Sequence, residues 1–152
     1  MTLDAKVPPV LLMALTAVGM WATDRVLPWP KSMPEWRIAV AAALVVLGAT
    51  VALAGVKAFR RHRTTVNPTR PTRSTSLVDT GIYAWTRNPM YLGMLLILVG
   101  WAVWLWNPWG GGWLAAFVAY MNRFQIKPEE AALRQLFGTA FERYMMKVNR
   151  WV

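Results

Sequence analysis

The stretch PMYLGMLLILVGWAVWLW, residues 89–106, contains no charged side chain and runs directly into the turn sequence Asn107-Pro108-Trp109-Gly110. A second apolar run extends from Gly110 to Ile126. An α-helix rises about 1.5 Å per residue, so about 18 residues cover roughly 27 Å, close to the hydrocarbon thickness of a bilayer. We therefore expect residues 89–106 and 110–126 to form an antiparallel hairpin of two short transmembrane helices.

Two further apolar runs precede this hairpin and predict two more transmembrane helices, at residues 7–26 and 36–59. The first run is not followed by a small-x-small cleavage site, so we expect it to be retained and not removed as a signal peptide. On the second, Gly48, Ala52 and Gly55 share one face, where small residues let a neighbouring helix approach closely. We expect this face to serve helix packing.

The charged residues are segregated from the apolar runs. The chain carries a net charge of +10 although 56% of its residues are hydrophobic. Between Lys57 and Asn88 lie seven Lys or Arg and a single acid, Asp79, so the positive-inside rule places this loop, and with it both termini, in the cytoplasm. Cations that flank separate helices do not form the continuous stripe of a nucleic-acid-binding protein. We therefore predict an integral protein of the inner membrane that contacts lipids and not nucleic acid.

The numbers of cysteines and histidines limit which catalytic and metal sites the chain can form. The chain has no Cys, which excludes disulfides, thiolate metal sites and a Cys nucleophile. Its one His, His62, lies among arginines in the polar loop and is expected to be a solvated loop residue. A single His cannot form a His-rich metal site, so we expect no metal centre.

Beyond residue 126 the pattern indicates a cytoplasmic amphipathic tail. Pro128 suits a first helical position, and acids such as Glu129 favour the positive N-terminal end of a helix. Gly138 is expected to end this helix, and Thr139 and Glu142 have the spacing of a capping box for a second one. The apolar faces of the two helices carry Leu133, Leu136 and Phe137, then Phe141, Tyr144, Met145 and Val148. The predicted fold is an all-α integral membrane protein, a single domain over residues 1–152, with about four transmembrane helices and this tail.

Polar side chains gather at the cytoplasmic ends of the third and fourth predicted helices, which a hairpin brings to one side of the membrane. They are either interfacial residues or a ligand site, and spacing alone leaves both open. No acid lies near the middle of a predicted span, which argues against a cation-coupled carrier. A small non-catalytic carrier or adaptor stays as the alternative to an enzyme. The gathered residues are Tyr83, Arg87, Asn88 and Tyr91, with Asn122, Arg123, Gln125, Glu129 and Glu130.

The run TGIYAWTRNPMYLG, residues 80–93, resembles the G-x-Y-x-x-x-R-[HN]-P-x-Y-x-G signature of the isoprenylcysteine carboxyl methyltransferase and phospholipid methyltransferase superfamily. The tail EEAALRQLFGTAFERYMMKV, residues 129–148, is similar to the E-E-x-x-L-x-x-x-F-G-x-x-Y-x-x-Y-x-x-x-V pattern of the same superfamily, with Phe141 where Tyr is usual. With Asn107-Pro108 at the hairpin turn, the match covers residues 77–151. The chain resembles a prokaryotic-type member.

This resemblance implies a methyltransferase that uses S-adenosylmethionine and releases S-adenosylhomocysteine. The cofactor pocket would be built by the hairpin and the tail and would open to the cytosol. A lipophilic or lipid acceptor with a carboxylate, thiol or amine would enter from the bilayer. Asn88 stands where the eukaryotic carboxyl methyltransferases have His, which sets this chain apart from that branch.

The resemblance also implies the roles of individual residues. Arg87 suits a bidentate pairing with the cofactor carboxylate, and Glu129 or Glu130 can accept from its amino group or ribose hydroxyls. The implied catalytic residues are Arg123, which would hold the substrate or pair with a Glu, and Glu130 and Tyr91, which would assist an acceptor that must lose a proton. The implied cofactor-binding residues are Tyr83, Arg87, Asn88, Tyr91, Leu92, Gly93, Asn122, Gln125, Glu129 and Glu130.

Overall fold

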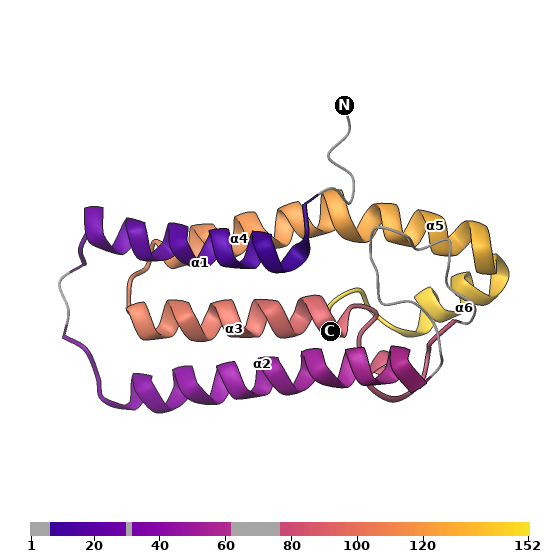
Figure 1. Cartoon of the computed structure of the whole chain (residues 1–152), viewed down its shortest axis with the longest axis horizontal. Coiled ribbons are helices and arrows are strands. Elements are labelled where there is room, and N and C mark those ends of the chain that lie inside the picture. Colours follow the sequence, from indigo (N-terminus) through magenta and orange to yellow (C-terminus); the bar gives the residue numbers. More distant parts are fainter. Residues whose placement is uncertain (1–6, 30–31, 62–76) are drawn as a thin grey trace.

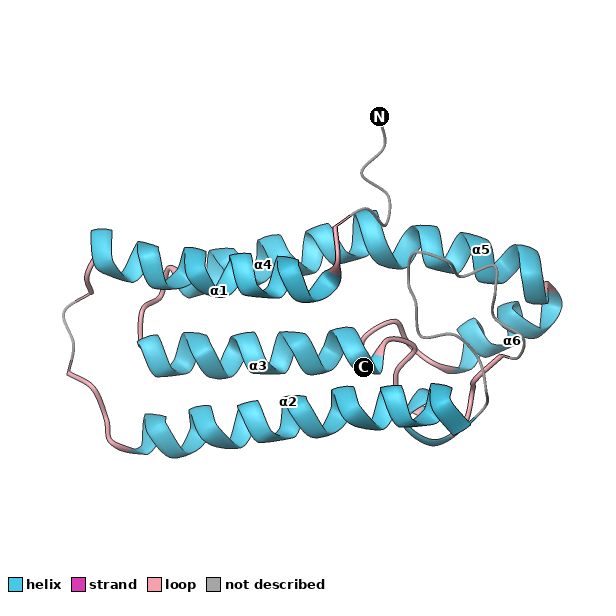
Figure 2. Cartoon of the chain, in the orientation of Figure 1, coloured by secondary structure: helices cyan, strands magenta, loops and turns pink. Residues whose placement is uncertain are grey.

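The structure, a computed structural model, describes residues 7–29, 32–61 and 77–152, and every regular element within these ranges is helical (Figure 2). The all-helical prediction is therefore confirmed for this part of the chain. The predicted loop residue His62 and the Arg-rich segment around it lie outside the described residues. The elements are α1 (Pro9–Val26), α2 (Trp36–Arg61), the short 3-10 helix η2 (Gly81–Ala84), α3 (Pro89–Leu105), α4 (Gly110–Tyr120), the π-helical η3 (Met121–Ile126), α5 (Lys127–Phe137) and α6 (Thr139–Lys147).

Helix α3 lies between α2 on one side and the layer of α1 and α4 on the other (Figure 1). Its buried residues Tyr91 and Leu98 pack with Met20 of α1 and Phe117 of α4 in one apolar core. The antiparallel hairpin of α3 and α4 is present as predicted, and it brings the start of α3 and the end of α4 to the same end of the bundle (Figure 1). This arrangement places α5, α6 and the polar side chains together at that end.

The small-residue face of α2 packs against α3, as the sequence predicted. A Cβ atom built on Gly93 would lie 2.4 Å from the backbone oxygen of Gly48 and 2.7 Å from Cβ of Ala52. A Cβ built on Gly48 would lie 2.5 Å from the backbone oxygen of Gly93. Only glycine at these two positions lets the backbones of the helices approach so closely.

Helix α2 is the one helix among the described residues that is long and apolar enough to cross a membrane, with a mean hydropathy of 2.4 in its most apolar window. Only 17% of that window is buried within the protein. Val46 and Leu53, for example, are 66% and 68% exposed. The core helix of a soluble protein would bury most of such side chains, so α2 presents an apolar outer surface.

Asn107, in the turn between α3 and α4, connects the hairpin to α1 by hydrogen bonds. This turn lies at the end of the bundle opposite the polar side chains. The side-chain Nδ2 of Asn107 donates to Oδ1 of Asp24 at 3.0 Å and to the backbone oxygen of Leu27 at 3.1 Å. Its Oδ1 accepts from the backbone N–H of Trp109 at 3.1 Å. Asn107 is only 8% exposed, and these three bonds satisfy its buried amide.

The predicted boundary at the start of the tail is confirmed, because η3 ends at Ile126 and α5 begins at Lys127 with Pro128 in its first positions. The sequence did not predict that α4, η3 and α5 follow one another without a break. The backbone N–H of Lys127 donates to the oxygen of Asn122, and Pro128, which has no N–H, follows it. The predicted capping box at Thr139 is wrong. Gly138, at φ +49°, is the N-cap of α6, and no side chain caps the helix.

Candidate active site

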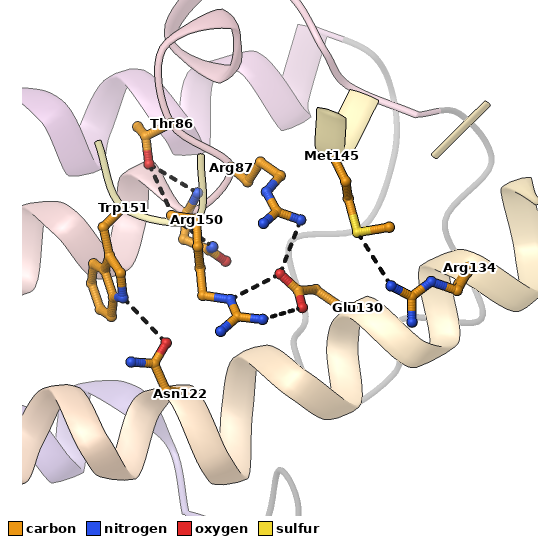
Figure 3. A network of polar contacts seen from close by, with 9 residues as sticks. Thr86, Arg87, Asn122, Glu130, Arg134, Met145, Arg150 and Trp151 are labelled. Atoms are coloured by element: carbon orange, nitrogen blue, oxygen red, sulfur yellow. Dashed lines mark hydrogen bonds and ion pairs between the residues drawn. The ribbon is translucent and has the colours of Figure 1, made fainter. Parts of the chain in front are cut away.

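The candidate site lies where the start of α3, the junction of η3 with α5 and the end of the chain meet (Figures 1 and 3). Gly81, at φ +64°, opens the turn of η2, and Pro89 occupies the first position of α3. The loop between them carries Arg87 and Asn88. The first turn of α5 brings Glu129 and Glu130 to the same place.

The carboxylate of Glu130 is bound by two arginines (Figure 3). Arg150 holds it with a fork, Nε to Oε1 at 3.0 Å and Nη2 to Oε2 at 2.6 Å. Nη1 of Arg87 lies 3.1 Å from Oε1, an ion-pair distance without hydrogen-bond geometry. The side chains of Arg87 and Glu130 are each 13% exposed. Both oxygens of Glu130 thus contact an arginine, and its predicted role in proton transfer stays a prediction.

Two of the three guanidinium nitrogens of Arg87 are buried and make no hydrogen bond. These are Nε and Nη1, which are shielded from solvent. Burial lowers the pKa of Arg87, and the neighbouring carboxylate of Glu130 opposes that shift, so the arginine keeps its charge. The two guanidinium groups and the carboxylate of Glu130 together carry one net positive charge. Because a buried cation with unmade hydrogen bonds is costly, this site is suited to an anion.

Glu129 forms a separate pair with Tyr91. The phenol of Tyr91 donates to Oε1 of Glu129 at 2.5 Å, and Tyr91 is only 5% exposed. The pKa of Glu129 is raised to about 7, mainly by burial and also by the charge of Glu130, while the hydrogen bond from Tyr91 opposes the shift. Glu129 can therefore exchange a proton near neutral pH.

Two further tyrosines hold the loop before α3 in place. The hydroxyl of Tyr144 donates to the backbone oxygen of Tyr83 at 2.7 Å. The ring of Tyr83, only 4% exposed, packs edge-to-face on Phe59 of α2 with centroids 5.3 Å apart. Burial raises the pKa of both hydroxyls, so both stay protonated. Tyr83 thus joins this loop to α2 and α6, and its predicted contact with a cofactor stays a prediction.

The last residues of the chain form a C-terminal strap, residues 149–151, across the site (Figure 3). The backbone N–H of Arg87 donates to the oxygen of Asn149 at 3.0 Å, and Nδ2 of Asn88 donates to the oxygen of Arg150 at 2.9 Å. Nε1 of Trp151 donates to Oδ1 of Asn122 at 3.2 Å. Sequence reasoning missed Arg150 and Trp151, because no spacing pattern connects them to residues twenty or more positions away.

Four further residues predicted for the site lie on α3 and η3. Gly93 faces Gly48 of α2, with no room on that side for a ligand. Arg123 is exposed, and its guanidinium lies 5.3 Å from the ring centroid of Phe124. The side chain of Gln125 is buried and donates to the backbone oxygen of Val7 at 2.6 Å. Leu92 is partly buried in the first turn of α3.

The chain is similar to known methyltransferases over most of its length. A family model described as phospholipid methyltransferase matches residues 36–140. The probable protein-S-isoprenylcysteine O-methyltransferase of Oryza sativa subsp. indica is 32% identical over 125 residues, which cover 80% of this chain and 64% of the rice protein. The protein-S-isoprenylcysteine O-methyltransferase of Mus musculus is 29% identical over 121 residues, which cover 79% of this chain and 43% of the mouse protein. The chain thus spans less than two thirds of either relative, and no solved structure matches it.

Proposed function

The chain belongs to the phospholipid methyltransferase family of methyltransferases, and from that premise we propose that it transfers the methyl group of S-adenosylmethionine to a lipophilic acceptor. The observation that carries this proposal is the guanidinium of Arg87, whose buried Nε and Nη1 lack hydrogen-bond partners. The cofactor has a carboxylate, and a carboxylate accepts two parallel hydrogen bonds from an arginine.

We propose that the protein lies in the inner membrane as a single domain, with α1 to α4 in the bilayer and the candidate site at the cytoplasmic face. The apolar outer surface of α2 supports a position in the bilayer. Arg60 and Arg61 in its last turn, at the same end of the bundle as the site (Figure 1), support the cytoplasmic orientation. A lipophilic acceptor then reaches the site from the bilayer, and the cofactor reaches it from the cytosol.

The residues at the site fit a zwitterionic cofactor. Arg87 supplies donors to its carboxylate, and Glu129 is the carboxylate not already held by an arginine, so it suits the amino group. When bound, S-adenosylmethionine supplies a methyl group activated by a sulfonium. The protein's part is to position that group and to exclude water, because methyl transfer is an in-line displacement.

The acceptor group is a carboxylate, thiol or amine. A carboxylate is already anionic, whereas an amine or thiol must first lose its proton. The Tyr91–Glu129 pair can accept this proton, because burial raises the pKa of Glu129 to about 7. Asn88 is less available for the acceptor, since its Nδ2 is bound to the strap.

Calorimetry with S-adenosylhomocysteine on the detergent-purified full chain tests the proposal. Wild-type protein should bind it, and Arg87→Gln should raise the dissociation constant roughly 10- to 100-fold, the usual effect of a lost charged hydrogen bond. Arg143→Gln is the matched control, because Arg143 is exposed on α6 and its Nε donates to the backbone oxygen of Thr139 in the same helix. Wild-type protein that binds no ligand at millimolar concentration would exclude this function.

A further inference from the structure

We propose that Arg150 is a positioning residue of this site, which holds Glu130 and thereby keeps the guanidinium of Arg87 available for the carboxylate of the cofactor. This inference rests on the proposed function. In this proposal Glu130 acts by binding the two arginines and does not contact the cofactor.

The first argument is the unequal sharing of Glu130. Arg150 makes two hydrogen bonds to the carboxylate, at 3.0 and 2.6 Å, in the planar fork that gives the strongest arginine–carboxylate pairs. Arg87 approaches the same carboxylate with one nitrogen at 3.1 Å and makes no hydrogen bond to it. Glu130 therefore forms its hydrogen bonds with Arg150, and the N–H groups without a hydrogen-bond partner are on Arg87.

The second argument is the way in which the C-terminal strap holds Arg150. The backbone oxygen of Arg150 accepts from Nδ2 of Asn88 at 2.9 Å and from Oγ1 of Thr86 at 3.4 Å. The neighbouring oxygen of Asn149 accepts from the N–H of Arg87 itself at 3.0 Å. The strap is thus fixed to the loop that carries Arg87 by backbone acceptors. A side-chain substitution at position 150 leaves those acceptors in place.

The third argument is the balance of charge. Arg87, Arg150 and Glu130 together carry a formal charge of +1. Without the side-chain charge of Arg150, the carboxylate of Glu130 would be left to pair with Arg87, the pair would be neutral, and the donors of Arg87 would be occupied. An incoming carboxylate would then have to displace Glu130 from a largely buried ion pair.

The experiment compares four variants of the full chain by calorimetry with S-adenosylhomocysteine. Arg150→Gln should weaken binding roughly tenfold or more. Glu130→Gln should bind at least as tightly as wild type, because both arginines remain charged. The double variant Arg150→Gln/Glu130→Gln should regain affinity to within about threefold of wild type, because no charged carboxylate at position 130 then competes for Arg87. Arg150→Lys keeps the charge but not the fork, so it should fall between wild type and Arg150→Gln.

Several results would overturn the inference while the proposed function stands. One is that Arg150→Gln binds S-adenosylhomocysteine as tightly as wild type. Another is that the double variant binds it no more tightly than Arg150→Gln alone, the result expected if the role of Arg150 is purely structural. Weakened binding by Glu130→Gln would mean that Glu130 contacts the cofactor itself. If Arg150→Gln does not fold, Arg150→Lys and Glu130→Gln decide the matter by the same criteria. No binding by wild-type protein would instead contradict the proposed function, and the inference with it.

Discussion

Substituting Gly93 by Ala should destabilise the protein by separating α2 from α3. The new Cβ would meet the backbone oxygen of Gly48 at 2.4 Å and Cβ of Ala52 at 2.7 Å, about 1 Å closer than ordinary contact. Backbone atoms cannot rotate away, so the helices must move apart, which costs about 3 kcal/mol at the upper end of overpacking effects. The higher helix propensity of Ala offsets about 1 kcal/mol. We expect a net loss of about 2 kcal/mol.

Thermal and denaturant unfolding in detergent, followed by circular dichroism, measures this loss. Gly111→Ala is the matched control, because a Cβ on Gly111 meets no atom within 4 Å. That variant should be as stable as wild type or gain up to about 1 kcal/mol. Gly48→Ala acts on the same helix crossing, so its effect and that of Gly93→Ala should be less than additive. Equal stability of Gly93→Ala and Gly111→Ala would refute the packing argument and reopen Gly93 as a ligand-binding position.

Two further predictions concern a titrating carboxyl and the hairpin turn. The pKa of Glu129 is raised, mainly by burial, from an ordinary 4.5 to about 7. Between these two pH values the folded protein therefore keeps a proton on Glu129 that the unfolded chain has lost. The free energy of unfolding should fall by at most about 3 kcal/mol as the pH rises from 4.5 to about 7. Glu129→Gln should flatten this dependence in a melting-temperature series, and an unchanged slope would contradict it. Asn107→Ala should cost about 1–3 kcal/mol through its lost buried hydrogen bonds, whereas exposed Asn149→Ala should be neutral; equal melting temperatures would contradict that.

The helices were predictable because their signals are local. An uncharged run from Pro89 and the turn at Asn107 determine the hairpin, and glycines at helical spacing on α2 identify its packing face. The continuity of α4 with α5 was not predictable. Pro128 lies at the start of α5, as its position in the sequence indicated, but the π segment η3 joins that helix to α4 without a break, and no local pattern signals such a segment.

The site was predictable only in part, because some of its contacts join residues that are far apart in the sequence. Arg87, Tyr91, Glu129 and Glu130 come together because the hairpin brings the ends of two helices to one place. The side chain of Arg150 reaches Glu130 only after the chain has turned back at Gly138 and crossed the loop before α3. Such a long-range contact leaves no periodic signal in the sequence.

Transfer of an isotope-labelled methyl group tests the central claim most directly. Detergent-purified protein would be incubated with labelled S-adenosylmethionine and, in turn, a prenylcysteine, a lipid amine and a lipophilic thiol, and the label would be counted in the organic phase. We predict a labelled lipophilic product with one of these acceptors, and its loss in Arg87→Gln but not in Arg143→Gln. Label that stays on the cofactor with every acceptor class, in protein that is folded and binds S-adenosylhomocysteine, would contradict the assignment of methyl transfer to this site.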